Sequence, residues 1–373
     1  MSMIASQRAP SMPLHTQRAD YIPALTGLRG IAAAAVVSLH VWNFTGGRKL
    51  DLLGYPLQAI PACGYLGVDL FFVLSAFLLA QPFLAAADDR RRWPALRTYF
   101  LRRGLRVVPA LWSQIAILFA VGWMMGGTPP FDARTILAYM FFLQNVVAHS
   151  GIINAVYWSL PVEWWFYFCI PFIAWLFGRT RWWWLLALFL VSGVAFRVAC
   201  WQWHNEAQLD KYANILLLRA RIDEFFLGIL AAWAHLHFRR DSPWRAFAAA
   251  TGALGLLALL PSLAERGDVF VRADYPWLLV HYSIVGSLLA LITFGVAGTV
   301  RWVIVLAGNR IVLWLGMISY SLYLWHFPVL QWTDKLGLWR NVTPLTATVI
   351  SVAAMLVTAA VSYRFIERPF LHR

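Results

Sequence analysis

Charged side chains are scarce in this sequence. Only 13% of its 373 residues are Asp, Glu, Lys or Arg, while 61% are hydrophobic. In a water-soluble chain of this length about a quarter of the residues would be charged. The scarcity argues against a soluble globular protein, and apolar runs of about twenty residues recur from Ile31 to Val361, the length that a membrane-spanning helix requires. We therefore expect an all-α membrane protein with about ten transmembrane helices and one re-entrant or interfacial segment.

Acidic residues are fewer still. The 17 Asp and Glu against 31 Lys and Arg leave a net charge of +14. Such a surplus can indicate nucleic-acid binding, but the 21 tryptophans and the long apolar runs are typical of a membrane protein with aromatic belts at its two interfaces. We expect no nucleic-acid partner.

Cysteine is nearly absent. Cys63, Cys169 and Cys200 have no metal-ligand spacing and form no even set, so we predict neither a metal site nor a disulfide framework and interpret them as small apolar residues. The first twenty residues also lack an apolar stretch that ends in a small-residue cleavage site, which excludes a cleaved signal peptide. We predict a cytoplasmic tail at 1–20 and one integral membrane domain at 21–373.

Basic clusters set the predicted topology. The arginine-rich segments 88–106, 178–181, 238–245 and 364–373 all fall on the cytoplasmic side if both termini are cytoplasmic and the chain crosses ten times. The crossings are predicted at 22–44, 64–86, 107–126, 158–178, 182–200, 213–236, 246–263, 276–298, 311–331 and 344–364. A further crossing at Thr135–Ala148 would reverse every later loop, so this segment is predicted to be re-entrant or interfacial and packed on protein.

Arg29 and His40 stand on the first apolar segment. Eleven residues at about 100° each return to nearly the same helix face, and at about 1.5 Å each they separate the two side chains by roughly 16 Å along the axis. A cation and an imidazole inside a membrane are costly, which makes a functional site the leading hypothesis. The spacing predicts a tunnel, with an anionic group held near Arg29 and proton chemistry near His40.

Other polar groups sort by predicted depth. Asp69, Glu163 and His326 fall near the outer level of His40, whereas Arg103 and Arg106, one helical turn apart, fall near the inner level of Arg29. Each has a structural alternative. Asp69 could cap its helix or pair with a neighbouring residue, and His326 could be an interfacial residue. A last group of charged residues could form internal ion pairs instead of binding substrate: Arg219, Arg221, Asp223 and Glu224.

Seven short motifs in a fixed order give the chain a resemblance that runs from Tyr21 to Phe370. They are Thr26-Gly-Leu-Arg29-Gly with His40, Gly67-Val-Asp-Leu-Phe-Phe-Val-Leu-Ser75, Arg103-Gly-Leu-Arg106-Val-Val-Pro109, Trp158-Ser-Leu-Pro-Val-Glu163, Arg221-Ile-Asp-Glu-Phe-Phe-Leu-Gly228, Ser319-Tyr-Ser-Leu-Tyr-Leu-Trp-His326 and Phe365-Ile-Glu-Arg-Pro369. The chain resembles the acyltransferase-3 family of integral membrane O-acyltransferases, which modify bacterial envelope polysaccharides. It departs from the family pattern at Ala76, where glycine is usual.

The resemblance implies an acyl-coenzyme A donor, most often acetyl-CoA, no metal, and a multi-pass location in the bacterial inner (cytoplasmic) membrane. Many members carry a soluble hydrolase-like domain. This chain ends at Arg373, so we expect a stand-alone form that transfers directly or through a periplasmic partner protein. The implied catalytic residues are His40, Glu163, Arg29 and Asp69. The implied donor-binding residues are Arg29, Arg103, Arg106 and Ser75. The implied acceptor-binding residues are Trp158, Ser159, Arg221, Asp223, Tyr323 and His326.

The chemistry of these residues fits such a reaction. Guanidinium groups suit the donor's phosphates. His40, with a reference pKa near 6.5, could act as a general base, with its tautomer fixed by Glu163. An acyl-imidazole on His40 is the alternative.

Other interpretations stay open at this point. A proton-coupled secondary transporter could use the same buried groups, although the two halves of the chain show no repeat. Succinyl or another acyl group could replace acetyl. The acceptor could be an exopolysaccharide, a lipopolysaccharide, a lipid-linked sugar or a non-sugar hydroxyl.

Overall fold

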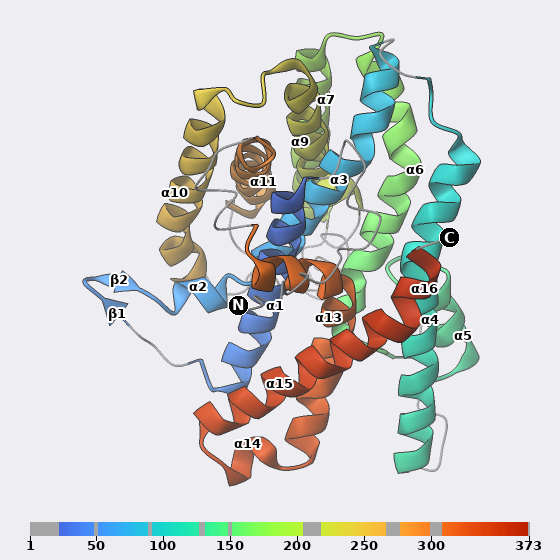
Figure 1. The fold of residues 1–373 in the computed structure, drawn as a ribbon, viewed down its shortest axis with the longest axis vertical. Coiled ribbons are helices and arrows are strands. Elements are labelled where there is room, and N and C mark those ends of the chain that lie inside the picture. The colour runs from blue at the N-terminus through green and yellow to red at the C-terminus, as the bar shows by residue number, and fades with distance from the viewer. Residues whose placement is uncertain are drawn as a thin grey trace, which may run out of the picture.

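The computed structural model describes residues 22–47, 51–88, 92–126, 131–147, 151–203, 218–265, 277–298 and 308–371. These residues form a bundle of long helices with one short hairpin (Figure 1). The long helices are α1 (Pro23–Phe44), α3 (Leu66–Ala87), α4 (Leu96–Gly126), α6 (Ser159–Phe177), α7 (Trp182–Trp203), α9 (Leu218–His237), α10 (Pro243–Glu265), α11 (Trp277–Val296), α13 (Arg310–Lys335) and α15 (Pro344–Ser362). The short elements are β1 (Asp51–Leu52), β2 (Tyr55–Pro56), α2 (Ala59–Ala62), α5 (Ala133–Met140), the 3₁₀ turn η2 (Ala155–Trp158), α14 (Leu338–Asn341), the π-helical turn η3 (Tyr363–Glu367) and α16 (Arg368–Leu371).

The fold class is confirmed. Nine of the described helices are long and apolar enough to cross a membrane, and α9 is a further long helix that carries four charged residues in its first two turns. The predicted tail at 1–20 and the first five residues of the span predicted at 213–236 lie outside the described residues.

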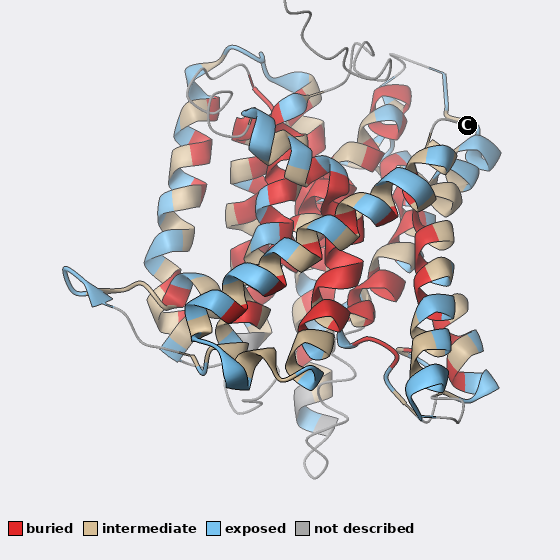
Figure 2. Ribbon diagram, turned by 60° about the horizontal axis from the view of Figure 1, so that its bottom comes forward, coloured by how far each residue is buried: buried red, intermediate tan, exposed pale blue. Residues whose placement is uncertain are grey.

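The buried core follows α3. This helix is apolar on all sides, as expected of a helix enclosed by others, and it packs against α1, α6, α9 and α11. Buried residues accordingly concentrate on the central helices, while α15, which runs obliquely across the bundle, exposes one face (Figure 2). The hairpin projects from one side, and the Tyr55 hydroxyl donates a hydrogen bond of 2.9 Å to the Leu257 carbonyl of α10.

The third predicted helix begins eleven residues earlier than expected. It was predicted at 107–126, but α4 starts at Leu96, so Arg97, Arg102, Arg103 and Arg106 lie on a helix and not in a loop. Arginine is a good helix former, and no glycine or proline interrupts the segment before Gly104. At about 1.5 Å per residue, α4 is roughly 46 Å long and exceeds a hydrocarbon core of about 30 Å. The helix continues past the hydrocarbon region, and there its charged side chains carry no cost of burial in lipid.

The segment predicted to be re-entrant contains only a short helix. Helix α5 has eight residues, about 12 Å, which is too short to span a bilayer. It is capped by Asp132, whose side chain accepts a hydrogen bond of 2.7 Å from the Thr135 backbone amide, and it packs beside α4. This agrees with the prediction that no crossing occurs here.

Glycines let α1 and α13 approach closely, which matters because these helices carry His40 and His326. A Cβ atom added at Gly316 would lie 1.9 Å from the Thr26 carbonyl oxygen, and one added at Gly30 would lie 2.6 Å from the Val312 carbonyl oxygen. Both obstacles are backbone atoms, so no side chain can move aside.

Gly316→Ala is therefore expected to force the two helices apart. Overpacking typically costs about 1–3 kcal/mol, which should appear as a lower melting temperature of the purified protein in detergent. Gly104→Ala is the matched control, because a Cβ there meets nothing within 4 Å and alanine favours a helix by about 1 kcal/mol. If both variants melt like the wild type, the close approach of α1 and α13 is wrong.

Candidate active site

Histidines from distant parts of the chain meet as a stacked pair. The His40 ring on α1 lies 5.0 Å from the His326 ring on α13, with the planes 22° apart, and the Phe327 ring meets His40 at 5.1 Å. His326 is fully buried, and its Nδ1 lies 2.7 Å from the Tyr323 carbonyl oxygen and 3.1 Å from that of Leu322. Because carbonyl oxygens only accept, Nδ1 carries the hydrogen and the helix backbone holds the ring. His40 is only partly buried.

Arg29 lines a small cavity of about 40 Å³ between α1, α3, α6 and α13. The other lining residues are Val68, Phe71, Phe72, Ser159, Leu160, Glu163, Ser319, Tyr320 and Tyr323. The Ser75 hydroxyl donates a short hydrogen bond to Glu163 Oε1. Ser159 and Tyr323 share a hydrogen bond of 2.6 Å between their hydroxyls. The cavity thus places a guanidinium and a carboxylate around a space with room for one small group.

Rings lie between the cavity and the histidine pair. The Arg29 guanidinium carbon is 5.9 Å from the Phe71 ring centre, the Phe71 and Tyr323 rings are 6.2 Å apart, and the Tyr323 and His326 rings are 5.9 Å apart. Arg29 and His40 both contact neighbouring helices, as their shared face predicts. Phe71 and Tyr323 therefore link the cavity wall to the histidine pair, and the open tunnel stays a prediction.

Glu163 lies with Arg29 and not with His40, and this corrects the predicted depth of the carboxylate. The described ring neighbours of His40 are His326 and Phe327, so the expectation that Glu163 fixes the His40 tautomer finds no contact to support it. Glu163 instead accepts from Ser75 on α3, which also means that the Ser75 hydroxyl is engaged and orients the carboxylate.

Two further arginines lie near Arg29. Arg29 lies within electrostatic range of Arg106, Glu163 and Arg103, as the sequence predicted for the cations. Tyr320, on the cavity wall, donates 2.9 Å to the carbonyl oxygen of Val107, the residue after Arg106.

Glu367, which the sequence analysis did not select, adds a second carboxylate near this group. It is buried, lies within electrostatic range of Arg106 and Arg29, and accepts a short hydrogen bond from Ser321. It ends the π-helical turn η3, and such turns are frequent at functional sites. Its position within the last quoted motif was the available signal.

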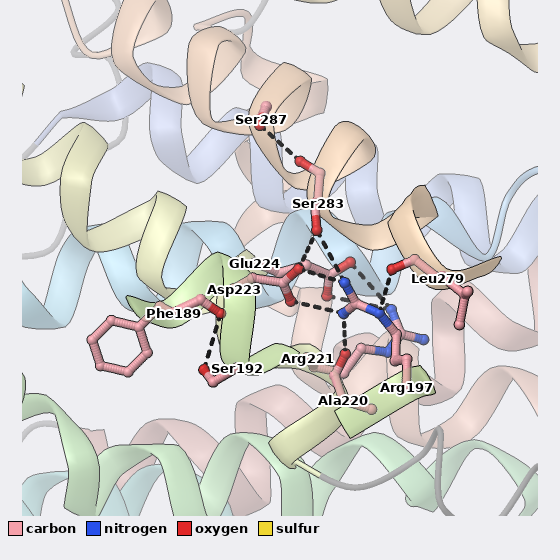
Figure 3. A network of polar contacts seen from close by, with 10 residues as sticks. All are labelled: Phe189, Ser192, Arg197, Ala220, Arg221, Asp223, Glu224, Leu279, Ser283 and Ser287. Carbon is pink, nitrogen blue, oxygen red and sulfur yellow. Dashed lines mark hydrogen bonds and ion pairs between the residues drawn. The ribbon is translucent and has the colours of Figure 1, made fainter. Parts of the chain in front are cut away.

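Asp69, Arg221 and Asp223 belong to a different cluster, and Figure 3 shows Arg221 and Asp223 with Arg197 and Glu224. Arg221 Nη1 lies 2.6 Å from Asp69 Oδ1 and 3.2 Å from Glu224 Oε1, and its guanidinium carbon is 3.6 Å from the Tyr282 ring centre. Asp223 accepts from both Nη atoms of Arg197, at 3.0 and 2.8 Å.

These ion pairs agree with the structural alternative for Asp69, Arg221 and Asp223. All three are at most 2% exposed, and each charge is opposed by a neighbour. Arg197 was missed, although a lone arginine within an apolar run is itself a signal.

Trp158 is partly enclosed by the same cluster. Its ring lies 5.6 Å from the Arg221 guanidinium carbon and edge-on to Phe72 at 6.3 Å. Its backbone carbonyl accepts 2.8 Å from the Asn145 side chain. Trp158 is therefore a packing residue at the start of α6 as well as a candidate acceptor contact.

Within the described residues, no three His, Cys, Asp or Glu side chains are grouped so that they could hold a metal ion. The fold and site define a multi-pass membrane protein whose interior holds a stacked histidine pair beside a cavity with a cationic wall.

The chain belongs to the acyltransferase family described as "Acyltransferase domain", whose model matches residues 22–364. A Staphylococcus aureus (strain COL) protein named "Putative O-acetyltransferase SACOL0978" is 24% identical over 378 residues, with 94% of this chain and 57% of that protein covered. "Peptidoglycan O-acetyltransferase OatA" of Listeria monocytogenes serovar 1/2a is also 24% identical, over 94% of this chain and 56% of the relative. The chain spans a little over half the length of these two relatives.

The match to a third relative covers nearly all of that protein. "Putative acetyltransferase ORF330" of Acidianus two-tailed virus is 25% identical over 333 residues, which cover 89% of this chain and 91% of the viral protein. No solved structure matches the chain. The predicted family is confirmed, and the described residues include several helices long and apolar enough to span a membrane.

Proposed function

We propose that this protein is a membrane O-acetyltransferase that moves an acetyl group from cytoplasmic acetyl-CoA to a hydroxyl of an envelope or exported polysaccharide. The names of the relatives support O-acetyl transfer. The membrane is then a bacterial inner membrane, with the arginine-rich helix ends and both termini on the cytoplasmic side, in accord with the positive-inside rule.

The donor is bound through its negatively charged phosphates. Arg103 and Arg106 on α4, with Arg29 on α1, bind its phosphates and arm, because permanently charged guanidinium forks match phosphate oxygens. Glu163 and Glu367 oppose part of this charge. The helix face shared by Arg29 and His40, roughly 16 Å long, gives the extended arm a direction from the cations toward the histidine pair.

His40 is the reactive residue in this proposal. It takes the proton of the acceptor hydroxyl while that oxygen forms a bond to the acetyl carbon. The carbon–sulfur bond breaks, and the proton ends on the sulfur of released CoA. In the alternative route, a His40 nitrogen attacks the acetyl carbon, the carbon–sulfur bond breaks, and CoA leaves with the imidazole proton. The acceptor oxygen then bonds to the acetyl carbon, the carbon–nitrogen bond breaks, and the hydroxyl proton returns to the imidazole. The observation that carries the proposal is that His40 is partly exposed and stacked on a backbone-anchored ring, on the same helix as Arg29.

The experiment is transfer in proteoliposomes. Wild-type protein receives [¹⁴C-acetyl]-CoA on one side and envelope polysaccharide, extracted from a bacterial strain that lacks the gene, on the other. Label in alkali-labile esters of the polysaccharide is expected. Label from succinyl-CoA alone would change the acyl group, and the absence of ester from any acyl-CoA, with proton-coupled solute uptake in its place, would refute the proposal.

A further inference from the structure

One hydroxyl on the wall of the Arg29 cavity has no hydrogen-bond partner among the described residues. Ser319 Oγ on α13 is buried, with its residue 0% exposed, and it lines the cavity with Arg29. A buried hydroxyl without a partner costs about 1–3 kcal/mol. Such groups are few in native proteins and call for an explanation.

The other hydroxyls that line the cavity are engaged. Ser159 and Tyr323 bind each other at 2.6 Å, Tyr323 also donates 2.6 Å to the Val156 carbonyl, and Tyr320 donates to Val107. Arg29 makes no hydrogen bond or ion pair to any described residue, and the Phe71 ring 5.9 Å away offers it only a π face. Ser319 and Arg29 are therefore the two uncommitted donors on one wall.

Two donors around a small space select a particular ligand group. The cavity of about 40 Å³ exceeds the roughly 10–15 Å³ that one water molecule needs on this measure. Glu163 on its wall disfavours an anionic phosphate, because like charges repel. A carbonyl oxygen is neutral, compact and able to accept two hydrogen bonds.

We propose that Ser319 and Arg29 form a binding site for a carbonyl oxygen on the slender arm of the acyl donor. This inference rests on the proposed function, because the donor arm of acyl-CoA carries two amide carbonyls and the thioester carbonyl. Arg103 and Arg106 hold the phosphates, and Ser319 adds the contact that fixes how far the arm extends toward the histidine pair.

Ser319→Ala separates this role from a structural one. The substitution removes an unsatisfied hydroxyl, so the melting temperature should stay equal or rise, whereas the dissociation constant of acetyl-CoA should increase about tenfold. A residue that serves packing alone would not give this opposite pair of effects.

Binding is measured by titration calorimetry of the full chain in nanodiscs with three probes: acetyl-CoA, CoA, and adenosine 3′,5′-bisphosphate, which has phosphates and no arm. Loss of affinity for both acetyl-CoA and CoA supports an amide carbonyl as the group bound. Loss for acetyl-CoA alone would place the thioester carbonyl at the cavity, away from His40, and would overturn the inference that the arm passes this site toward the histidine pair. The bisphosphate should bind wild type and variant equally.

Thr293→Val is the matched control, because it removes an equally buried hydroxyl that donates 2.8 Å to Leu289 of its own helix. It should bind every probe like the wild type. Equal binding of acetyl-CoA by Ser319→Ala and wild type overturns the inference, as does an equal loss of affinity for the bisphosphate. If wild type binds none of the three probes, the donor in the proposed function is wrong instead.

Discussion

Acetyl transfer is expected to fall by at least about a thousandfold when His40 is replaced by alanine, since general bases and nucleophiles contribute about 10²–10⁴ or more to rate. His40 is the partly exposed member of the histidine pair. His326 presents its hydrogen-bearing Nδ1 to the backbone carbonyls of Tyr323 and Leu322 and is fully buried. The measurement is ester formation in the proteoliposome assay.

His40→Phe tests whether a loss of transfer comes from the missing imidazole nitrogens or from a disturbed fold. Phenylalanine preserves an aromatic ring against His326 and Phe327 and removes both nitrogens, so its melting temperature should match the wild type while its transfer rate falls as in His40→Ala. His237→Ala is the control: this histidine lies at the end of α9, 3.4 Å from Asp88, outside the proposed site, and its loss should leave transfer unchanged. Wild-type rates in His40→Phe would end the proposed role of His40.

The two chemical routes are separable in the same system. An acetylated His40 peptide trapped in a single turnover would favour the acyl-imidazole route. Its absence, with transfer intact, would favour general-base catalysis. His326 would then serve as the fixed surface on which the charged imidazole of His40 stacks.

The helices were predictable because both of their signals, the length of each apolar run and the position of the basic clusters, are local features of the sequence. Helix α13, for example, begins where Asn309 caps it, with a hydrogen bond of 3.0 Å from the Val312 amide, close to the predicted start at 311. The beginning of α4 was not predictable from the same rule, since the bilayer limits where charge is buried and does not limit where a helix starts.

The site was predictable in part. The 3.6-residue period placed Arg29 and His40 on one face, and the topology placed Arg103 and Arg106 near Arg29. Sequence could not say which buried charge meets which, because helices α3, α7, α9 and α11 come together only in the fold. Asp69 was therefore predicted to be a catalytic carboxylate, although it forms an ion pair with Arg221, which lies 152 residues later in the sequence.

Asp223→Ala is expected to be the most destabilising single change in the ion-pair cluster. Arg197 would keep its charge in the core while losing two hydrogen bonds, at 3.0 and 2.8 Å, and Ser283 would lose the acceptor of its short hydrogen bond. Breaking a buried pair from one side typically costs about 3–5 kcal/mol. The protein should express poorly in membranes or melt far below the wild type.

The double variant Asp223→Leu with Arg197→Met tests the cause. Removal of both charges leaves no uncompensated ion, and replacement of a buried pair by apolar residues is often neutral or better. The double variant should regain most of the melting temperature that Asp223→Ala loses. Asp241→Asn breaks an exposed pair with Arg239, 2.9 Å apart, and should change nothing measurable because water screens it. If the double variant melts as low as Asp223→Ala, the loss comes from packing around α9 and not from the unpaired guanidinium.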